Sequence, residues 1–113
     1  MNKFFKITKL KKRRTLTDRS IHLHILENFK KLNFTAKRIY FHDYKKNHSI
    51  KNKFNHSDTM FIPLNGVLKI LIGKKKIILK KNQSLLIKKN IIFDLKSTKS
   101  FFVVLSDQNY NKL

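Results

Sequence analysis

Short apolar runs separated by polar turns recur along most of the chain. The clearest stretch is residues 59–80, where apolar runs flank the only two glycines, Gly66 and Gly73. Runs of this length are too short for a confident helix, and their many β-branched side chains favour strands. Asn65-Gly66 indicates a two-residue hairpin turn, because that turn needs positive φ at its centre. We therefore predict three consecutive antiparallel strands in this stretch.

Similar runs occur on both sides of this stretch. We expect strands at residues 4–10, 20–27, 34–41, 85–88, 91–95 and 101–105. The last run is almost continuously apolar, as a buried central strand would be, whereas the lysines of residues 4–10 are typical of an edge strand. About nine short strands without a convincing amphipathic helix indicate an all-β sandwich or barrel. We expect a single domain over residues 1–113.

Two polar segments are expected to be loops. For the basic run at residues 11–14 we favour an exposed loop over a phosphate-binding segment. Residues 43–57 are polar and contain His48 and His56, and a loop of that length in a compact domain is usually functional or mobile. In residues 20–27, His22 and His24 share one strand face, but Glu27 lies on the other, so we expect no metal site.

The composition narrows the classes of function. The chain has no cysteine, which excludes disulfides and thiolate chemistry and fits a reducing compartment. It shows no apolar run of membrane-spanning length and no signal peptide, so we expect a cytoplasmic protein with no membrane partner. The six acidic residues are scattered singly, so no carboxylate pair indicates glycosidase chemistry.

The formal net charge of +21 raises the question of nucleic-acid binding. Aromatic residues among lysines, such as Phe41, Tyr44 and Phe54, would suit a single strand. However, only four of the 27 basic residues are arginine, the side chain whose planar fork best matches phosphates and bases. Lys, Asn, Ile and Phe all have codons rich in A and U, so a biased genome explains the lysine excess. A basic β-barrel that binds single-stranded nucleic acid is the less favoured alternative.

Five stretches, in order, resemble one known family. Residues 34–41 (FTAKRIYF) resemble its F-x-x-K-R-V-Y-Y strand, and residues 60–66 (MFIPLNG) resemble its L-N-G turn. Residues 18–27 are similar to its opening strand, residues 85–87 to the strand before its Trp-His pair, and residues 102–110 to its closing strand. This order and spacing give a resemblance to the sugar-nucleotide 3,4-ketoisomerase cupins, the FdtA/QdtA or WxcM-like group.

The resemblance implies a cupin-like jelly roll, usually an intertwined homodimer. It implies a protein that acts on a nucleotide-linked 4-keto-6-deoxy sugar, such as a dTDP-sugar, in deoxysugar and surface polysaccharide biosynthesis. We expect no cofactor. Arg38 and Tyr40 match the family's pocket-facing strand. They are two residues apart on that strand, so they should share a face that lines the barrel. The resemblance implies that Arg38 contacts phosphate or the sugar ring and that Tyr40 orients a sugar hydroxyl.

The chain departs from the family at the histidines. The family carries a His-x-His pair before the L-N-G turn, and counting back from Gly66 places these positions at Asn52 and Phe54. Its Trp-His pair falls on Ile92 and Phe93 by the same count. Moving a ketone along a sugar ring needs a base that takes a proton from carbon and an acid that returns it. Neither Asn nor Phe can do this near neutral pH.

We therefore predict catalytic roles for Tyr40 and for His48 or His56, because histidine titrates near neutrality. Arg38 and Asn52 are the predicted substrate-binding residues. The main alternative is a catalytically inactive cupin that binds a nucleotide sugar or serves as an interaction module.

Overall fold

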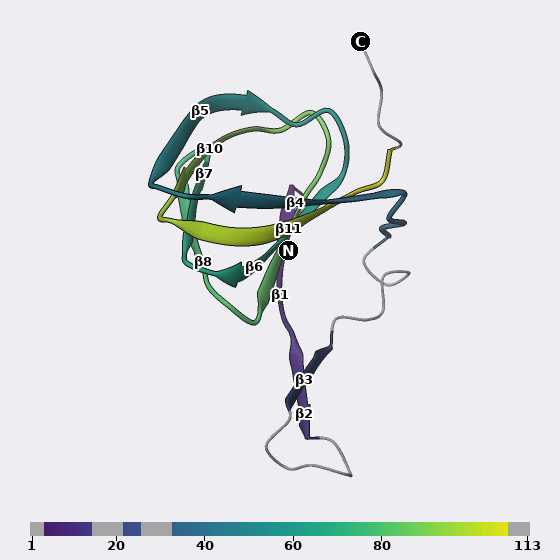
Figure 1. The fold of residues 1–113 in the computed structure, drawn as a ribbon. Coiled ribbons are helices and arrows are strands. Elements are labelled where there is room, and N and C mark those ends of the chain that lie inside the picture. Colours follow the sequence, from purple (N-terminus) through teal and green to yellow (C-terminus); the bar gives the residue numbers. More distant parts are fainter. Residues whose placement is uncertain (1–3, 15–21, 26–32, 109–113) are drawn as a thin grey trace.

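The computed structural model describes residues 4–14, 22–25 and 33–108 (Figure 1). All regular structure in these residues is β-strand. The strands are β1 (Phe5–Lys9), β2 (Lys11–Arg14), β3 (His22–Ile25), β4 (Arg38–Tyr44), β5 (His48–Phe54), β6 (Thr59–Asn65), β7 (Leu68–Ile72), β8 (Lys75–Leu79), β9 (Gln83–Ile87), β10 (Ile92–Ser97) and β11 (Ser100–Ser106). No helix in the described part of the chain is long and apolar enough to cross a membrane.

Two antiparallel sheets form the body of the fold. One has five strands in the order β1-β9-β6-β11-β4, and the other has four in the order β5-β10-β7-β8. Strands β2 and β3 pair with each other alone, away from the two larger sheets (Figure 1). The all-β jelly-roll architecture expected from the sequence is confirmed, as are the edge position of β1 and the interior position of β11.

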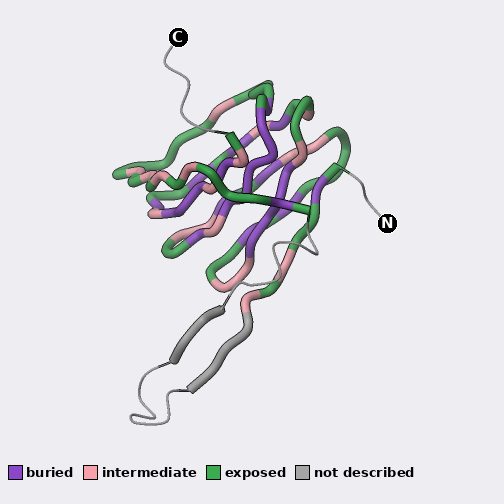
Figure 2. The backbone as a smooth tube through the Cα atoms, turned by 90° about the vertical axis from the view of Figure 1, so that its right-hand side faces the viewer, coloured by how far each residue is buried: buried purple, intermediate pink, exposed green. Residues whose placement is uncertain are grey.

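The core lies between the two larger sheets (Figure 2). Alternate residues of each strand face inward, so both sheets contribute apolar side chains to one buried cluster. Its members are Phe5, Phe61, Leu68, Ile70, Ile77, Leu79, Leu85, Ile87, Phe93, Leu95, Phe102 and Val104. A smaller cluster of Phe34, Met60 and Leu86 lies on the opposite face of the five-stranded sheet, because Met60 and Leu86 alternate with Phe61 and Leu85.

The predicted Asn65-Gly66 hairpin is wrong in one respect. The turn is present, but β6 belongs to the five-stranded sheet and β7 to the four-stranded sheet, so the turn carries the chain between sheets. Gly66 has a φ of 84°, and a Cβ there would lie 2.6 Å from the Ser100 Cβ, so only glycine fits. The following hairpin, β7–β8 with Gly73 in its turn, is confirmed.

Three further predictions from the sequence are also wrong, one about the bounds of a strand and two about segments expected to be loops. The strand predicted at residues 34–41 is β4, which begins at Arg38 and continues to Tyr44. The long loop predicted at residues 43–57 contains the seven-residue strand β5, and the basic run at residues 11–14 is strand β2. Strand β5 lies at a sheet edge and is mostly exposed, so backbone pairing with β10 defines it rather than apolar burial. A hydrophobic pattern cannot reveal such a strand.

Candidate functional site

A cavity of about 250 Å³ lies between the two sheets, beside their edge strands β4 and β5. Aromatic, basic and hydroxyl side chains line it together with core residues. The lining residues are Arg38, Tyr40, His42, Tyr44, Ile50, Lys53, Phe54, Asn55, His56, Ser57, Thr59, Phe61, Phe93, Leu95, Phe102 and Val104. Lys53, Phe54 and His56 are exposed, so the cavity reaches the surface beside them.

Strand β4 supplies most of the cavity's polar chemistry. It pairs with β11 in unbroken register, so its side chains alternate strictly between the two faces of the sheet. Arg38 and Tyr40 both line the cavity, which confirms the predicted shared face. The Arg38 Cζ atom lies 5.1 Å from the centre of the Tyr40 ring, within the range of a cation–π contact. On the other face of β4, Ile39 and Phe41 are exposed.

His42 is a cavity residue that the sequence analysis missed. It follows Tyr40 on the same face of β4, and its ring lies 5.0 Å from the Tyr40 ring and 5.8 Å from the Tyr44 ring. Burial lowers the pKa of His42 below its usual value, because it disfavours the charged imidazolium. Simple alternation along the strand would have revealed it, but the predicted strand ended at Phe41, three residues before the end of β4.

Tyr44 continues the same face of β4 beyond His42. Its ring makes an edge contact with the buried Phe102 ring at 5.2 Å. Burial raises the pKa of the Tyr44 phenol, so the hydroxyl stays protonated at neutral pH and can donate a hydrogen bond. The cavity therefore presents a guanidinium, two phenols and an imidazole from one strand.

Among the histidines predicted to be catalytic, only His56 lines this cavity. Its side chain is exposed, and its ring packs against the Phe54 ring with the centres 4.8 Å apart. His48 is exposed at the other end of β5, where its ring meets the Tyr44 ring at 4.9 Å. His48 lines a separate surface hollow with Val67 and does not line the cavity.

Asn52, the predicted substrate-binding residue of β5, also lies outside the cavity lining. Its φ is 54°, and its backbone N–H donates a 2.8 Å hydrogen bond to Asp94 Oδ1. Phe93 pairs with Lys53 and Leu95 with Ile50, so two residues of β5 oppose Asp94 alone. This is a β-bulge, which changes the side-chain alternation along β5.

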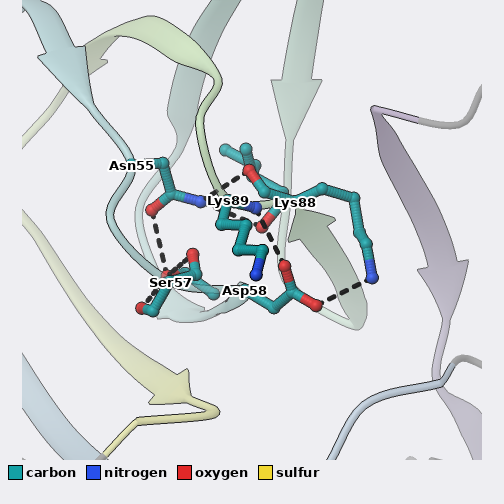
Figure 3. A network of polar contacts seen from close by, with 7 residues as sticks. Asn55, Ser57, Asp58, Lys88 and Lys89 are labelled. Carbon is teal, nitrogen blue, oxygen red and sulfur yellow. Dashed lines mark hydrogen bonds and ion pairs between the residues drawn. The ribbon is translucent and has the colours of Figure 1, made fainter.

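A polar network fixes the segment between β5 and β6 that carries His56 (Figure 3). The Asn55 amide donates to the carbonyls of Ile87 and Lys88 at 3.0 Å and accepts from the Thr59 hydroxyl at 3.0 Å. The Asp58 carboxylate pairs with the Lys88 ammonium at 2.7 Å and accepts the Lys89 N–H at 2.8 Å. These partners hold the rim of the cavity against the end of β9.

A second part of this network joins the same segment to β11. The Ser57 hydroxyl lies 2.8 Å from the Ser106 hydroxyl and 3.1 Å from the Thr59 hydroxyl, and all three side chains are buried. Within the described residues, no three His, Cys, Asp or Glu side chains gather into a group that could hold a metal ion. The side chains of His22 and His24 lie outside the described part.

Comparison with solved structures places this fold among sugar ketoisomerases. No family model and no curated protein sequence matches the chain. The WlaRB TDP-quinovose 3,4-ketoisomerase of Campylobacter jejuni matches with 27% identity and a TM-score of 0.78, over 97% of this chain and 89% of that one. A 3,4-ketoisomerase of Helicobacter canadensis matches with 27% identity and a TM-score of 0.75, over 96% and 86%.

A third similar structure is the WlaRA TDP-fucose-3,4-ketoisomerase of Campylobacter jejuni. It is 29% identical, with a TM-score of 0.70 over 95% of this chain and 84% of that one. The three matches cover nearly the whole chain, and they confirm both the cupin fold and the resemblance to this group of enzymes.

Proposed function

We propose that this chain, a divergent cupin relative of the sugar 3,4-ketoisomerases, binds a nucleotide-linked 4-keto-6-deoxy sugar and interconverts its 4-keto and 3-keto forms. One observation carries the proposal. Strand β4 brings Arg38, Tyr40, His42 and Tyr44 into a single cavity, in a fold shared over nearly the whole chain with enzymes of that activity.

The size of the cavity limits how such a ligand can sit. Pockets that enclose a whole drug-sized ligand usually measure about 300–1,000 Å³. At about 250 Å³ the cavity suits the sugar ring, and the nucleotide then lies across the rim. Lys53 at the rim favours the diphosphate, and the exposed His56 ring, which packs on Phe54, offers a surface on which the base can stack. His48 and Asn52 have no contact in this binding mode.

The cavity also offers the groups that the reaction needs. Isomerisation removes a proton from C3 and adds one to C4, while a proton moves from the 3-oxygen to the 4-oxygen. An imidazole can perform the carbon steps, and a tyrosine hydroxyl can serve the oxygens. Arg38, at one end of the β4 row in the cavity lining, is the proposed contact for phosphate or the sugar ring.

A direct test is to incubate the protein with dTDP-4-keto-6-deoxyglucose and follow the sugar by NMR. We expect the 3-keto isomer to accumulate with time. Calorimetric titration with dTDP measures binding separately from conversion. If the sugar stays unchanged at high protein concentration while dTDP binds, isomerisation of that substrate is excluded and the binding part of the proposal remains.

A catalytically inactive nucleotide-sugar binder is the second candidate function. It is favoured by the two positions at which the family's His-x-His falls, because Asn52 lies outside the cavity lining and Phe54 carries no acid–base group. Under this alternative, calorimetry detects dTDP but the NMR spectrum of the sugar never changes. If dTDP does not bind either, both candidate functions fail.

The proposal includes a cytoplasmic homodimer. The outer face of the five-stranded sheet leaves Ile39 57%, Phe41 61% and Leu64 44% exposed, and the Phe41 ring stacks on Phe101 at 5.9 Å. An apolar patch of this kind is typical of a protein interface, and a second copy is the partner that the resemblance implies. Sedimentation should give a dimer for the native chain and a monomer for F41K. A monomeric native chain would contradict the dimer.

A further inference from the structure

We infer that His42 is the catalytic base and acid of this cavity, the group that takes the proton from C3 of the sugar and delivers one to C4. The inference rests on the proposed function and deepens it. It moves the acid–base chemistry from β5, where the resemblance implies it, to the neighbouring strand β4.

The place of His42 in the cavity is the first reason. It lies in the middle of the β4 row, between Tyr40 and Tyr44, with ring centres at 5.0 and 5.8 Å. Successive residues on one face of a strand are about 6.8 Å apart along it, so a sugar ring beside His42 also reaches the Tyr40 hydroxyl. The imidazole must reach C3 and C4 of the sugar while the tyrosine hydroxyl reaches the oxygens on these two carbons, and this spacing allows both contacts.

The availability of the imidazole nitrogens is the second reason. Among the described residues, none donates a hydrogen bond to the His42 ring or accepts one from it. The ring is half-buried. Some polar atoms of the described residues are fully buried without a hydrogen-bond partner, but neither His42 nitrogen is among them. Both nitrogens therefore keep contact with open space while the carbon face of the ring is covered. A structural core histidine would instead have a hydrogen-bond partner.

The packing of the ring is the third reason. The His42 ring stacks on Phe102 with the centres 4.8 Å apart and the planes 10° from parallel. Phe102 is fully buried, so it offers a rigid surface that fixes the orientation of the imidazole. Burial also lowers the pKa of His42, which keeps the neutral, proton-accepting form dominant at pH 7. The chain thus holds a base in fixed geometry without a second polar partner.

The other described histidines near β5 fit this role less well. His56 is exposed at the rim and packs against Phe54, so it faces the position that we assign to the nucleotide. His48 is exposed and lines a different hollow. Phe54 occupies the cavity wall at a position where the family carries a histidine. Within the described residues, His42 is therefore the imidazole best placed for the sugar.

The proton transfers balance without an oxidant or a reductant. The His42 imidazole takes the proton from C3, the C3–H electron pair forms a C3=C4 bond, and the 4-oxygen takes the Tyr40 hydroxyl proton. The product of this step is an enediol beside an imidazolium and a phenolate. The imidazolium then protonates C4, and the 3-hydroxyl returns a proton to the phenolate as the 3-ketone forms. Both side chains end in their starting states.

The test compares H42N with the native chain and with H48N, which removes an imidazole outside the cavity. Each full-length protein is incubated with dTDP-4-keto-6-deoxyglucose in D₂O, and NMR follows both the 3-keto product and the exchange of the C3 hydrogen for deuterium. Calorimetry with dTDP reports binding. We expect H42N to bind dTDP normally and to lose exchange and isomerisation by at least about 100-fold, while H48N retains both.

Two further measurements make the result independent of one variant. H42Q should show the same loss, which covers the case in which H42N does not fold. In the native chain, the His42 ring resonances should shift when the sugar nucleotide binds, and dTDP alone should shift them less. Native exchange rates in folded H42N and H42Q, or unmoved His42 resonances, would overturn the inference and leave the proposed function intact. A native chain that binds dTDP without exchange or isomerisation would overturn both the inference and the isomerase activity.

Discussion

Strands β4 and β5 are consecutive, equally long and border the same cavity, yet they present their side chains differently. β4 pairs with β11 without interruption from Arg38 to Tyr44, and every second side chain faces the cavity. β5 pairs with β10 across a bulge, and its cavity-lining residues are Ile50, Lys53 and Phe54. The two strands show that a regular ladder preserves alternation, whereas one extra residue changes which side chains face inward.

The difference matters for the chemistry, because the resemblance locates the acid–base residues on β5. The bulge directs Asn52 outward and anchors its backbone to Asp94. Under the proposed function, the chain keeps its site residues on the strand whose alternation is intact. We expect substitutions on β4, and in the buried residues that pack against it, to affect stability and activity more than equivalent substitutions on β5.

The largest expected effect comes from the surface on which His42 stacks. Phe102 is 0% exposed, so F102A should lower the free energy of unfolding by about 3–5 kcal/mol through lost burial and the cavity that remains. The half-buried Ile50 of β5 is the matched site, and I50A should cost about 2 kcal/mol or less. Urea unfolding followed by circular dichroism measures both. Equal losses would contradict the comparison.

The next effect is on catalysis and uses the two β5 positions that the resemblance marks. In an H42N background, F54H returns an imidazole to the cavity wall, so it should restore isomerisation by about 100-fold. N52H places its imidazole outside the cavity lining and should restore nothing. NMR of dTDP-4-keto-6-deoxyglucose separates the two variants. Recovery in N52H alone would show that the bulge does not direct residue 52 outward.

A smaller effect is expected at the bulge itself. Asn52 has a φ of 54°, a backbone region that costs most L-residues about 1–2 kcal/mol but suits glycine and asparagine. N52A should therefore lower the free energy of unfolding by about 1 kcal/mol, and N52G by less. Urea unfolding of the two variants gives the difference. If alanine is the better tolerated residue, the β5 backbone does not adopt the bulge.

The smallest effect is the contribution of His42 to the pH dependence of stability. Its pKa is lowered on folding, so the unfolded chain binds more protons, and the free energy of unfolding should fall as pH decreases from 6.5 through the folded pKa. H42Q should reduce this slope, whereas the loss of ring packing on Phe102 should lower stability equally at every pH. Urea midpoints collected across this pH range test it. An unchanged slope in H42Q would contradict burial of the neutral imidazole.

The sequence by itself determined the fold class and much of the strand pattern. A strand that is buried on one face alternates apolar and polar residues, and a strand that is buried on both faces, such as residues 101–105, is almost continuously apolar. Both patterns can be read directly from the amino-acid sequence. The position of Arg38 and Tyr40 on the same, cavity-facing side of β4 was also predictable, because the alternation of side chains along a regular strand follows from backbone geometry.

Only the tertiary structure decided where β5 lies, which of its residues face the cavity and that His42 joins the site. β5 is exposed and polar, so its strand conformation comes from hydrogen bonds to a partner distant in sequence, and no local pattern records that partner. Its bulge depends on Asp94, which is 42 residues from Asn52 along the chain. His42 became a site residue because β4 continues to Tyr44 along β11, a pairing that only the folded sheet can specify.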